Sequence, residues 1–270
     1  MRHAAQCAET VLFWDEHDGA RLYFEDSAVD IESHELEGRP MADGPAQIDS
    51  VLADLSALPG DWHDCGLLSI GALRSIARHA GPGVAHTVET GSGSSTIFFS
   101  HLSASHITFS VDDGRSISQV WKSSLFRPSA VRLVEGPTQL TMPSFVFEDP
   151  IDVALIDGPH GYPFPDLEYY YIYPHVRTGG LLVVDDVHIP TIRNLFKFLR
   201  EDAMWDLVEV VRGRTAIFRR TDAPTFSPTG DGWWLQLYNF HHVPMTPLAR
   251  LRSSLPAPLR RRLKALLGRR

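Results

Sequence analysis

Short apolar runs separated by helix-length segments dominate the chain from Val84 onward. Each run ends in polar or glycine residues, and the five runs are AHTVE, HITFSV, VRLVE, DVALID and LLVVDD. Such runs are typical of parallel strands that are buried on both faces and joined by crossover helices. The next segments, NLFKFLRE and then LVEVV and TAIFRR around RGR, predict a helix and an antiparallel hairpin. The pattern therefore predicts an α/β, doubly wound, Rossmann-like fold with a seven-stranded, mostly parallel sheet and an antiparallel C-terminal hairpin.

The segments on either side of these runs follow different patterns. Apolar residues recur at helical spacing between about Gln47 and Ala80, with LPGDWHD as a break, which predicts two helices before the sheet. In residues 1–45, TVLFW and ARLYFE flank DEHDG, which predicts two strands around a turn in an N-terminal appendage. We expect residues 46–220 to form the main domain, 221–248 an irregular, packed extension, and 249–270 a basic amphipathic tail.

The charge distribution limits the classes of partner. The chain has 270 residues and a formal net charge of -8, but eight of its 25 basic residues lie in the last 21 positions. The preceding residues carry 17 basic against 33 acidic side chains, a balance of -16 that argues against an extended nucleic-acid surface on the main body. The tail carries Leu259, Leu263, Leu266 and Leu267 on one helical face and basic residues on the others. This tail would give weak contact with an anionic membrane surface, or else form a solvated helix or a dimer contact in a homo-oligomer.

The cysteines and the hydropathy indicate the compartment. Cys7 and Cys65 stand far apart without partner spacing, so neither a disulfide framework nor a zinc site is expected. No stretch approaches the roughly 18 to 20 apolar residues of a membrane span. We therefore expect a soluble, cytoplasmic protein.

A glycine-rich turn follows the first predicted strand, in the sequence ETGSGSST from Glu89 to Thr96. Glycines there permit a tight turn and the close approach of a ligand to the backbone, although they also serve simply to pack a helix on a strand. Asp112 ends the second strand 19 residues after Gly93, close to the separation of about 20 residues at which an acid meets a ribose hydroxyl. Asp113 is the alternative. A dinucleotide site would favour a third glycine at Thr96, which makes NAD the weaker candidate.

The Glu89-x-Gly91-x-Gly93 motif resembles the first motif of S-adenosylmethionine (SAM) methyltransferases of class I. This resemblance implies SAM as the cofactor, with Glu89, Gly91, Gly93, Ser95 and Asp112 at its site. It extends over roughly residues 84 to 220 in the order of the motifs. One departure is the segment EGPTQLT after the third strand, which lacks the usual polar or acidic residue near the adenine.

Three carboxylates follow the fourth and fifth predicted strands. Asp157 ends DVALID, and Asp185 and Asp186 end LLVVDD. Because these strand ends open on one edge of a doubly wound sheet, the carboxylates would repel one another unless bound protons or a cation reduced that repulsion. Magnesium prefers oxygen ligands of this kind. Alternatively, Asp157 and Asp185 merely end strands and cap the following loops.

The segments around these acids resemble the metal-dependent O-methyltransferases of the catechol and antibiotic-sugar types. By that resemblance Asp157, Asp185 and Asp186 match the ligands of a Mg²⁺ ion, and His160 falls where the catechol enzymes place a lysine base. DGPHGYPFP with VVDD is similar to a broader group of bacterial methyltransferase-like proteins. The resemblance implies methyl transfer to an oxygen of a small-molecule or saccharide acceptor, with His160 as the general base.

Other interpretations remain open at this stage. In a second interpretation His160 has a structural role and His188 is the base instead. Most of the tyrosines between Tyr162 and Tyr173 are expected to pack in the core rather than to bind substrate. The chain would alternatively be a SAM-binding protein without transfer activity that acts as a partner subunit through residues 221–270. An NAD-linked oxidoreductase is the third hypothesis.

Overall fold

The computed structural model describes residues 44–59, 62, 67–111, 116–226, 236–242, 255 and 259. The chain divides into two units, Met1–Glu37 and Gly38–Arg270, and all described residues belong to the second. The predicted strands of the N-terminal appendage lie outside the described residues. The same holds for most of the predicted extension and nearly all of the basic tail.

Within the described residues, seven strands form one sheet in the order β3-β2-β1-β4-β5-β7-β6. Neighbouring strands from β3 to β5 pair in parallel, and β7 pairs antiparallel with both β5 and β6. This arrangement confirms the predicted sheet and its C-terminal hairpin. The strands are β1 (His86–Thr90), β2 (Ser105–Ser110), β3 (Val131–Glu135), β4 (Ile151–Ile156), β5 (Val176–Val184), β6 (Trp205–Val211) and β7 (Thr215–Arg220).

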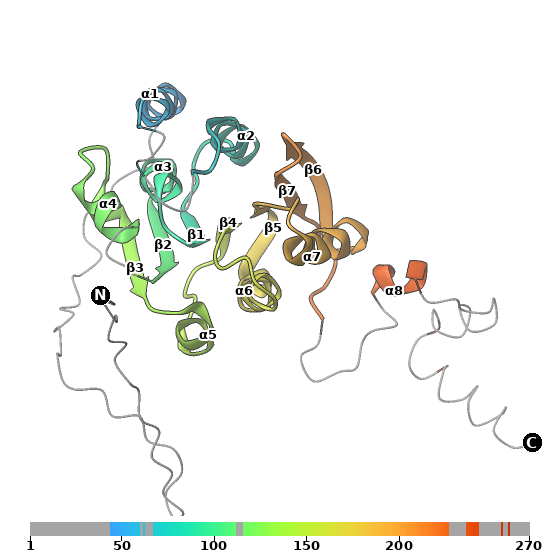
Figure 1. Cartoon of the computed structure of the whole chain (residues 1–270). Helices are drawn as coiled ribbons and strands as arrows, with labels where there is room; N and C mark the ends of the chain where they lie inside the picture. Colours follow the sequence, from blue (N-terminus) through green and yellow to red (C-terminus); the bar gives the residue numbers. More distant parts are fainter. Residues whose placement is uncertain are drawn as a thin grey trace, which may run out of the picture. The chain divides into compact units, whose positions relative to one another are not determined.

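Helices cover both faces of the sheet (Figure 1). Helices α1, α2 and α3 lie on one face, and α5, α6 and α7 lie on the other. Their bounds are α1 (Pro45–Ser56), α2 (Ile70–Ala80), α3 (Ser94–Leu102), α4 (Ser116–Lys122), α5 (Thr138–Thr141), α6 (Phe164–Ile172), α7 (Pro190–Glu201) and α8 (Leu237–His242). The two helices predicted before the sheet are α1 and α2. No helix in the described part of the chain is long and apolar enough to cross a membrane.

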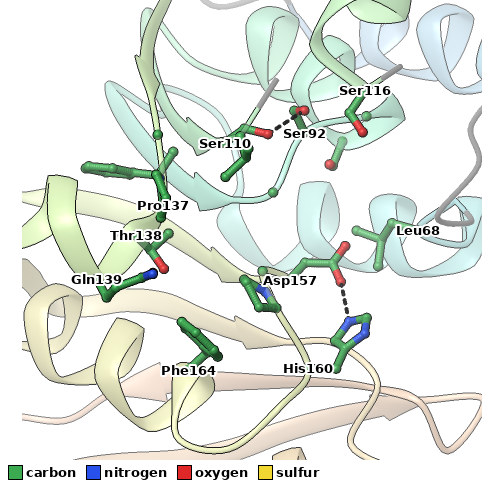
Figure 2. Close-up of a pocket in the computed structure, with 18 of the residues that line it drawn as sticks. Leu68, Ser92, Ser110, Ser116, Pro137, Thr138, Gln139, Asp157, His160 and Phe164 are labelled. Carbon is green, nitrogen blue, oxygen red and sulfur yellow. Dashed lines mark hydrogen bonds and ion pairs between the residues drawn. The ribbon is translucent and has the colours of Figure 1, made fainter. Parts of the chain in front are cut away.

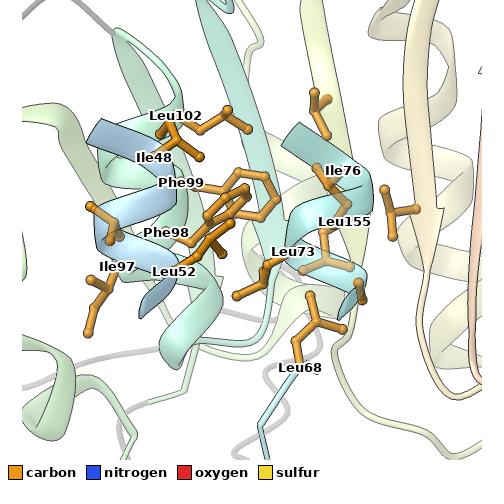
Figure 3. Packing of buried hydrophobic residues seen from close by; sticks show 14 of the residues in the cluster. Ile48, Leu52, Leu68, Leu73, Ile76, Ile97, Phe98, Phe99, Leu102 and Leu155 are labelled. Carbon is orange, nitrogen blue, oxygen red and sulfur yellow. The ribbon is translucent and has the colours of Figure 1, made fainter. Parts of the chain in front are cut away.

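Alternation along the central strands explains why their sequences are apolar throughout. In β4, Val153 and Leu155 face the core beneath α1, α2 and α3, while Ala154 and Ile156 face the core beneath α6 and α7. Successive side chains of a strand point to opposite faces, so a strand with helices on both sides needs apolar residues at every position. Figure 3 shows the first of these cores, in which Phe98 and Phe99 of α3 are fully buried.

Candidate functional site

A cavity of about 590 Å³ lies at the carboxyl ends of the strands. This is the edge where ligands of doubly wound sheets bind, and the volume suits a nucleoside-sized ligand. Its wall includes the turn after β1, the end of β2, and the segments from Gly136 to Gln139 and from Asp157 to His160. Leu68, Ser116 and Phe164 complete the lining. Figure 2 shows Ser92 and Ser110 hydrogen-bonded on one side of the cavity, and Asp157 and His160 on the other.

The turn after β1 depends on its glycines. Gly91 has a φ of +86°, in the left-handed region, and a Cβ added there would lie 2.6 Å from the carbonyl oxygen of Asp157. Glycine is therefore required by both conformation and space. Gly93 is the N-cap of α3. Gly91, Gly93 and Ser95 all line the cavity, and their contact with a cofactor stays a prediction.

Glu89 lies apart from these residues. Its side chain is fully buried and does not line the cavity. The Thr96 hydroxyl donates a hydrogen bond to Glu89 Oε1, and His106 Nε2 lies 3.1 Å from the same oxygen. Glu89 thus joins β1 to α3 and β2 from behind the turn, and a direct contact with the cofactor stays a prediction. Asp112 and Asp113 lie outside the described residues.

Asp157 and His160 form a polar pair on the cavity wall. His160 Nε2 lies 3.7 Å from Asp157 Oδ1 and 3.5 Å from Asp186 Oδ2. Burial raises the pKa of Asp157 to about 7, and the Asp157 carboxylate in turn raises the pKa of His160 above its usual value. Each of the two groups therefore influences the protonation of the other. The pair is therefore suited to proton transfer.

The two acids after β5 are held by partners from the hairpin. Arg214 donates two hydrogen bonds to Asp186 Oδ1, with Nη2 at 2.6 Å and Nε at 3.2 Å, and Thr215 donates to Asp185 Oδ1. Across the described residues, no three His, Cys, Asp or Glu side chains are arranged to hold a metal ion. The positive charge beside Asp186 comes from Arg214 instead. In this arrangement the residues do not fit the magnesium site that the sequence resemblance implies.

One protein-family model matches the central part of the chain. Residues 88–187 match a family model described as a methyltransferase domain. The matched range contains the glycine turn, Asp157, His160 and both acids after β5, and it lies within the seven-stranded sheet with its antiparallel hairpin. Residues 88–187 are therefore similar to a methyltransferase domain. No curated protein matches the chain.

Solved methyltransferase structures are similar to this chain over about two thirds of its length. An O-methyltransferase from Bacillus cereus, in complex with S-adenosylhomocysteine (SAH), has 14% identity and a TM-score of 0.47, covering 65% of this chain and 90% of its own. The O-methyltransferase TomG from Streptomyces achromogenes, in complex with SAM, has the same identity and TM-score, at 67% and 92% coverage. A Podospora anserina methyltransferase bound to SAH has 16% identity and a TM-score of 0.47, at 67% and 91% coverage.

The tyrosines of the matched segment lie away from the cavity, since none from Tyr162 to Tyr173 lines it. Tyr169 is buried, stacks on Tyr173 and accepts a hydrogen bond from Trp205 Nε1. Tyr169 and Tyr173 therefore pack against each other, whereas Tyr162 and Tyr170 are exposed. His188 lies near Asp186 Oδ1, at 3.5 Å, and does not line the cavity either.

One buried acid of the matched segment, Glu168, is not singled out by the sequence patterns. Its side chain is fully buried on α6, and it accepts hydrogen bonds from the hydroxyls of Thr90, at 2.8 Å, and Thr138, at 3.0 Å. Burial raises the pKa of Glu168 to about 7. An acid amid aromatic residues at a buried position of a helix is the sequence signal that would have pointed to it.

The raised pKa of Glu168 predicts that stability falls as pH rises. The folded chain keeps its proton between the unfolded value of 4.5 and about 7, so over that interval the folded state binds more protons than the unfolded state. The free energy of unfolding should therefore decrease by about 3 kcal/mol as this carboxyl is forced to ionise.

Urea unfolding of wild type and Glu168→Gln at pH 5 and pH 8 measures this decrease. The variant should show a shallower decrease, whereas Glu135→Gln, at an exposed carboxyl, should follow wild type. Equal slopes for all three proteins would contradict the prediction.

Proposed function

We propose that this methyltransferase moves a methyl group from SAM to an oxygen atom of a small or saccharide-like hydroxylated molecule, with His160 as the general base. The observation that carries the proposal is the Asp157–His160 pair on the wall of the cavity that the glycine turn lines. A hydroxyl nucleophile must lose its proton during transfer, and a base beside the cofactor cleft meets that need.

The reaction needs no redox partner. The acceptor oxygen attacks the methyl carbon, the carbon–sulfur bond of the sulfonium breaks, and SAH leaves as a neutral thioether. The hydroxyl proton passes to His160, beside which the carboxylates of Asp157 and Asp186 stabilise the resulting imidazolium. A general base typically contributes about 10² to 10⁴-fold, and alignment of the acceptor behind the methyl group supplies much of the rest.

Two hydrogen bonds hold His160 and the neighbouring Asp157 in place. The Thr191 hydroxyl at the start of α7 donates a hydrogen bond to the carbonyl oxygen of His160. The backbone N–H of Asp157 donates to the Thr90 hydroxyl, which ties the end of β4 to β1. These contacts support a fixed base beside the cavity. The proposal contains no step through magnesium, because Arg214 pairs with Asp186 and Thr215 donates to Asp185.

Calorimetric titration with SAM and SAH tests the proposal before any acceptor is known. Wild type should bind both, with and without Mg²⁺, and Asp112→Ala should weaken binding about 10-fold to 100-fold if that acid holds the ribose hydroxyls. Asp113→Ala is the matched control and should bind as wild type. Absence of SAM and SAH binding under every condition would contradict the proposal. Tight binding without any methyl transfer across hydroxylated acceptors would favour a cofactor-binding partner subunit instead.

A further inference from the structure

Glu168 lies behind the cavity, at a point where three of its walls meet. It belongs to α6, which packs beside β4 (Figure 1). Thr90 ends β1 and Thr138 begins α5, and the hydroxyls of both donate to the Glu168 carboxylate. These two threonines are 48 residues apart in the chain, so one buried side chain joins the end of β1 to the segment that follows β3.

The third wall is the end of β4. A Cβ added at Gly158 would overlap both carboxylate oxygens of Glu168. The glycine that follows Asp157 therefore leaves room for this buried acid, and its φ is not in the left-handed region. The Thr90 hydroxyl that donates to Glu168 also accepts a hydrogen bond from the N–H of Asp157. Through Thr90, Glu168 is thus linked to the backbone of Asp157, which lies beside the proposed base His160.

We infer that Glu168 is a positioning residue that holds the ends of β1 and β4 and the start of α5 in the register that binds the cofactor and places Asp157 against His160. The inference rests on the proposed function. Glu168 does not line the main cavity, so it acts through Thr90, Thr138 and Gly158 and not by contact with the cofactor. Glu168 contacts all three segments at once, through the two threonine hydroxyls and Gly158. If the acid were removed, both buried hydroxyls would lose their acceptor.

The first test compares Glu168→Ala with Glu168→Gln. Alanine removes the acceptor of both threonines, so the dissociation constant for SAH should rise about tenfold or more. Glutamine keeps the shape and one acceptor oxygen, so its affinity should stay within about threefold of wild type. Tyr170→Ala, on the exposed face of the same helix, is the matched control and should bind as wild type. All titrations are made well below the melting temperature of each variant, so that a loss of global stability alone does not alter binding.

The second test is a double-mutant cycle with Gly158→Ala, read as the free energy of unfolding. Gly158→Ala alone should destabilise the protein because its methyl group overlaps the Glu168 carboxylate. In the Glu168→Ala background that space is vacant, so the methyl group should be tolerated and the two changes should be non-additive. Additive changes would overturn the inference, as would wild-type SAH affinity in Glu168→Ala or equal losses in the alanine and glutamine variants. If wild type itself bound no SAH, the proposed function would fail, and the cycle would still decide whether Glu168 holds Gly158.

Discussion

Replacement of His160 by alanine is expected to lower kcat by about 10² to 10⁴-fold, the usual contribution of a general base. The SAH dissociation constant should change by less than about threefold, because the imidazole is proposed to take a proton rather than to bind the cofactor. The measurement is SAH release with an acceptor found by screening hydroxylated compounds, together with calorimetric titration of SAH. A loss confined to kcat assigns the residue to the chemical step.

The neighbouring histidine provides the control for this prediction. His188 lies 3.5 Å from Asp186 and is about as exposed as His160, with side-chain exposures of 46% and 41%. His188→Ala should keep most of the activity, since His188 does not line the cavity. The reverse result, with activity lost in His188→Ala and kept in His160→Ala, would move the base to His188. Full activity in both variants would remove the histidine base from the mechanism.

The sheet could be predicted from the sequence because its strands are buried on both faces. DVALID and LLVVDD contain no polar residue before their terminal acids except Asp152, and β4 and β5 occupy the centre of the sheet. Parallel strands in a doubly wound order open on one edge, so the convergence of Asp157 and Asp186 near His160 also follows from the pattern. The distances of 3.5 and 3.7 Å to His160 agree with that expectation.

The direction and partners of individual side chains could not be predicted in the same way. Glu89 stands two residues before Gly91, but strand alternation turns it toward α3, while Thr90 turns toward α6. Arg214 lies in the predicted RGR turn, yet its pairing with Asp186 depends on how the hairpin folds back beside β5. Glu168 is 78 residues from Thr90. Each of these contacts joins segments whose proximity arises only in the folded chain.

A second large effect is expected for Gly91→Ala. Two costs add at this position: alanine must adopt a φ near +86°, and its methyl group would lie 2.6 Å from the carbonyl oxygen of Asp157. The first cost is of order 1 kcal/mol or more for a residue with a side chain. The second is overpacking of about 1–3 kcal/mol, because the neighbour is backbone rather than the end of a flexible side chain. The free energy of unfolding should therefore fall by about 2–4 kcal/mol.

Cofactor binding should fall as well, since relief of the overlap at Gly91 separates the turn after β1 from the end of β4, and both line the cavity. We expect SAH affinity to decrease at least about tenfold. Gly83→Ala is the matched control: Gly83 has a φ of +78°, but nothing lies within 4 Å of an added Cβ. It carries the conformational cost alone and should leave SAH binding unchanged. Equal losses of stability in the two variants, with SAH binding intact in both, would show that the close approach of Gly91 to Asp157 does not set the geometry of the site.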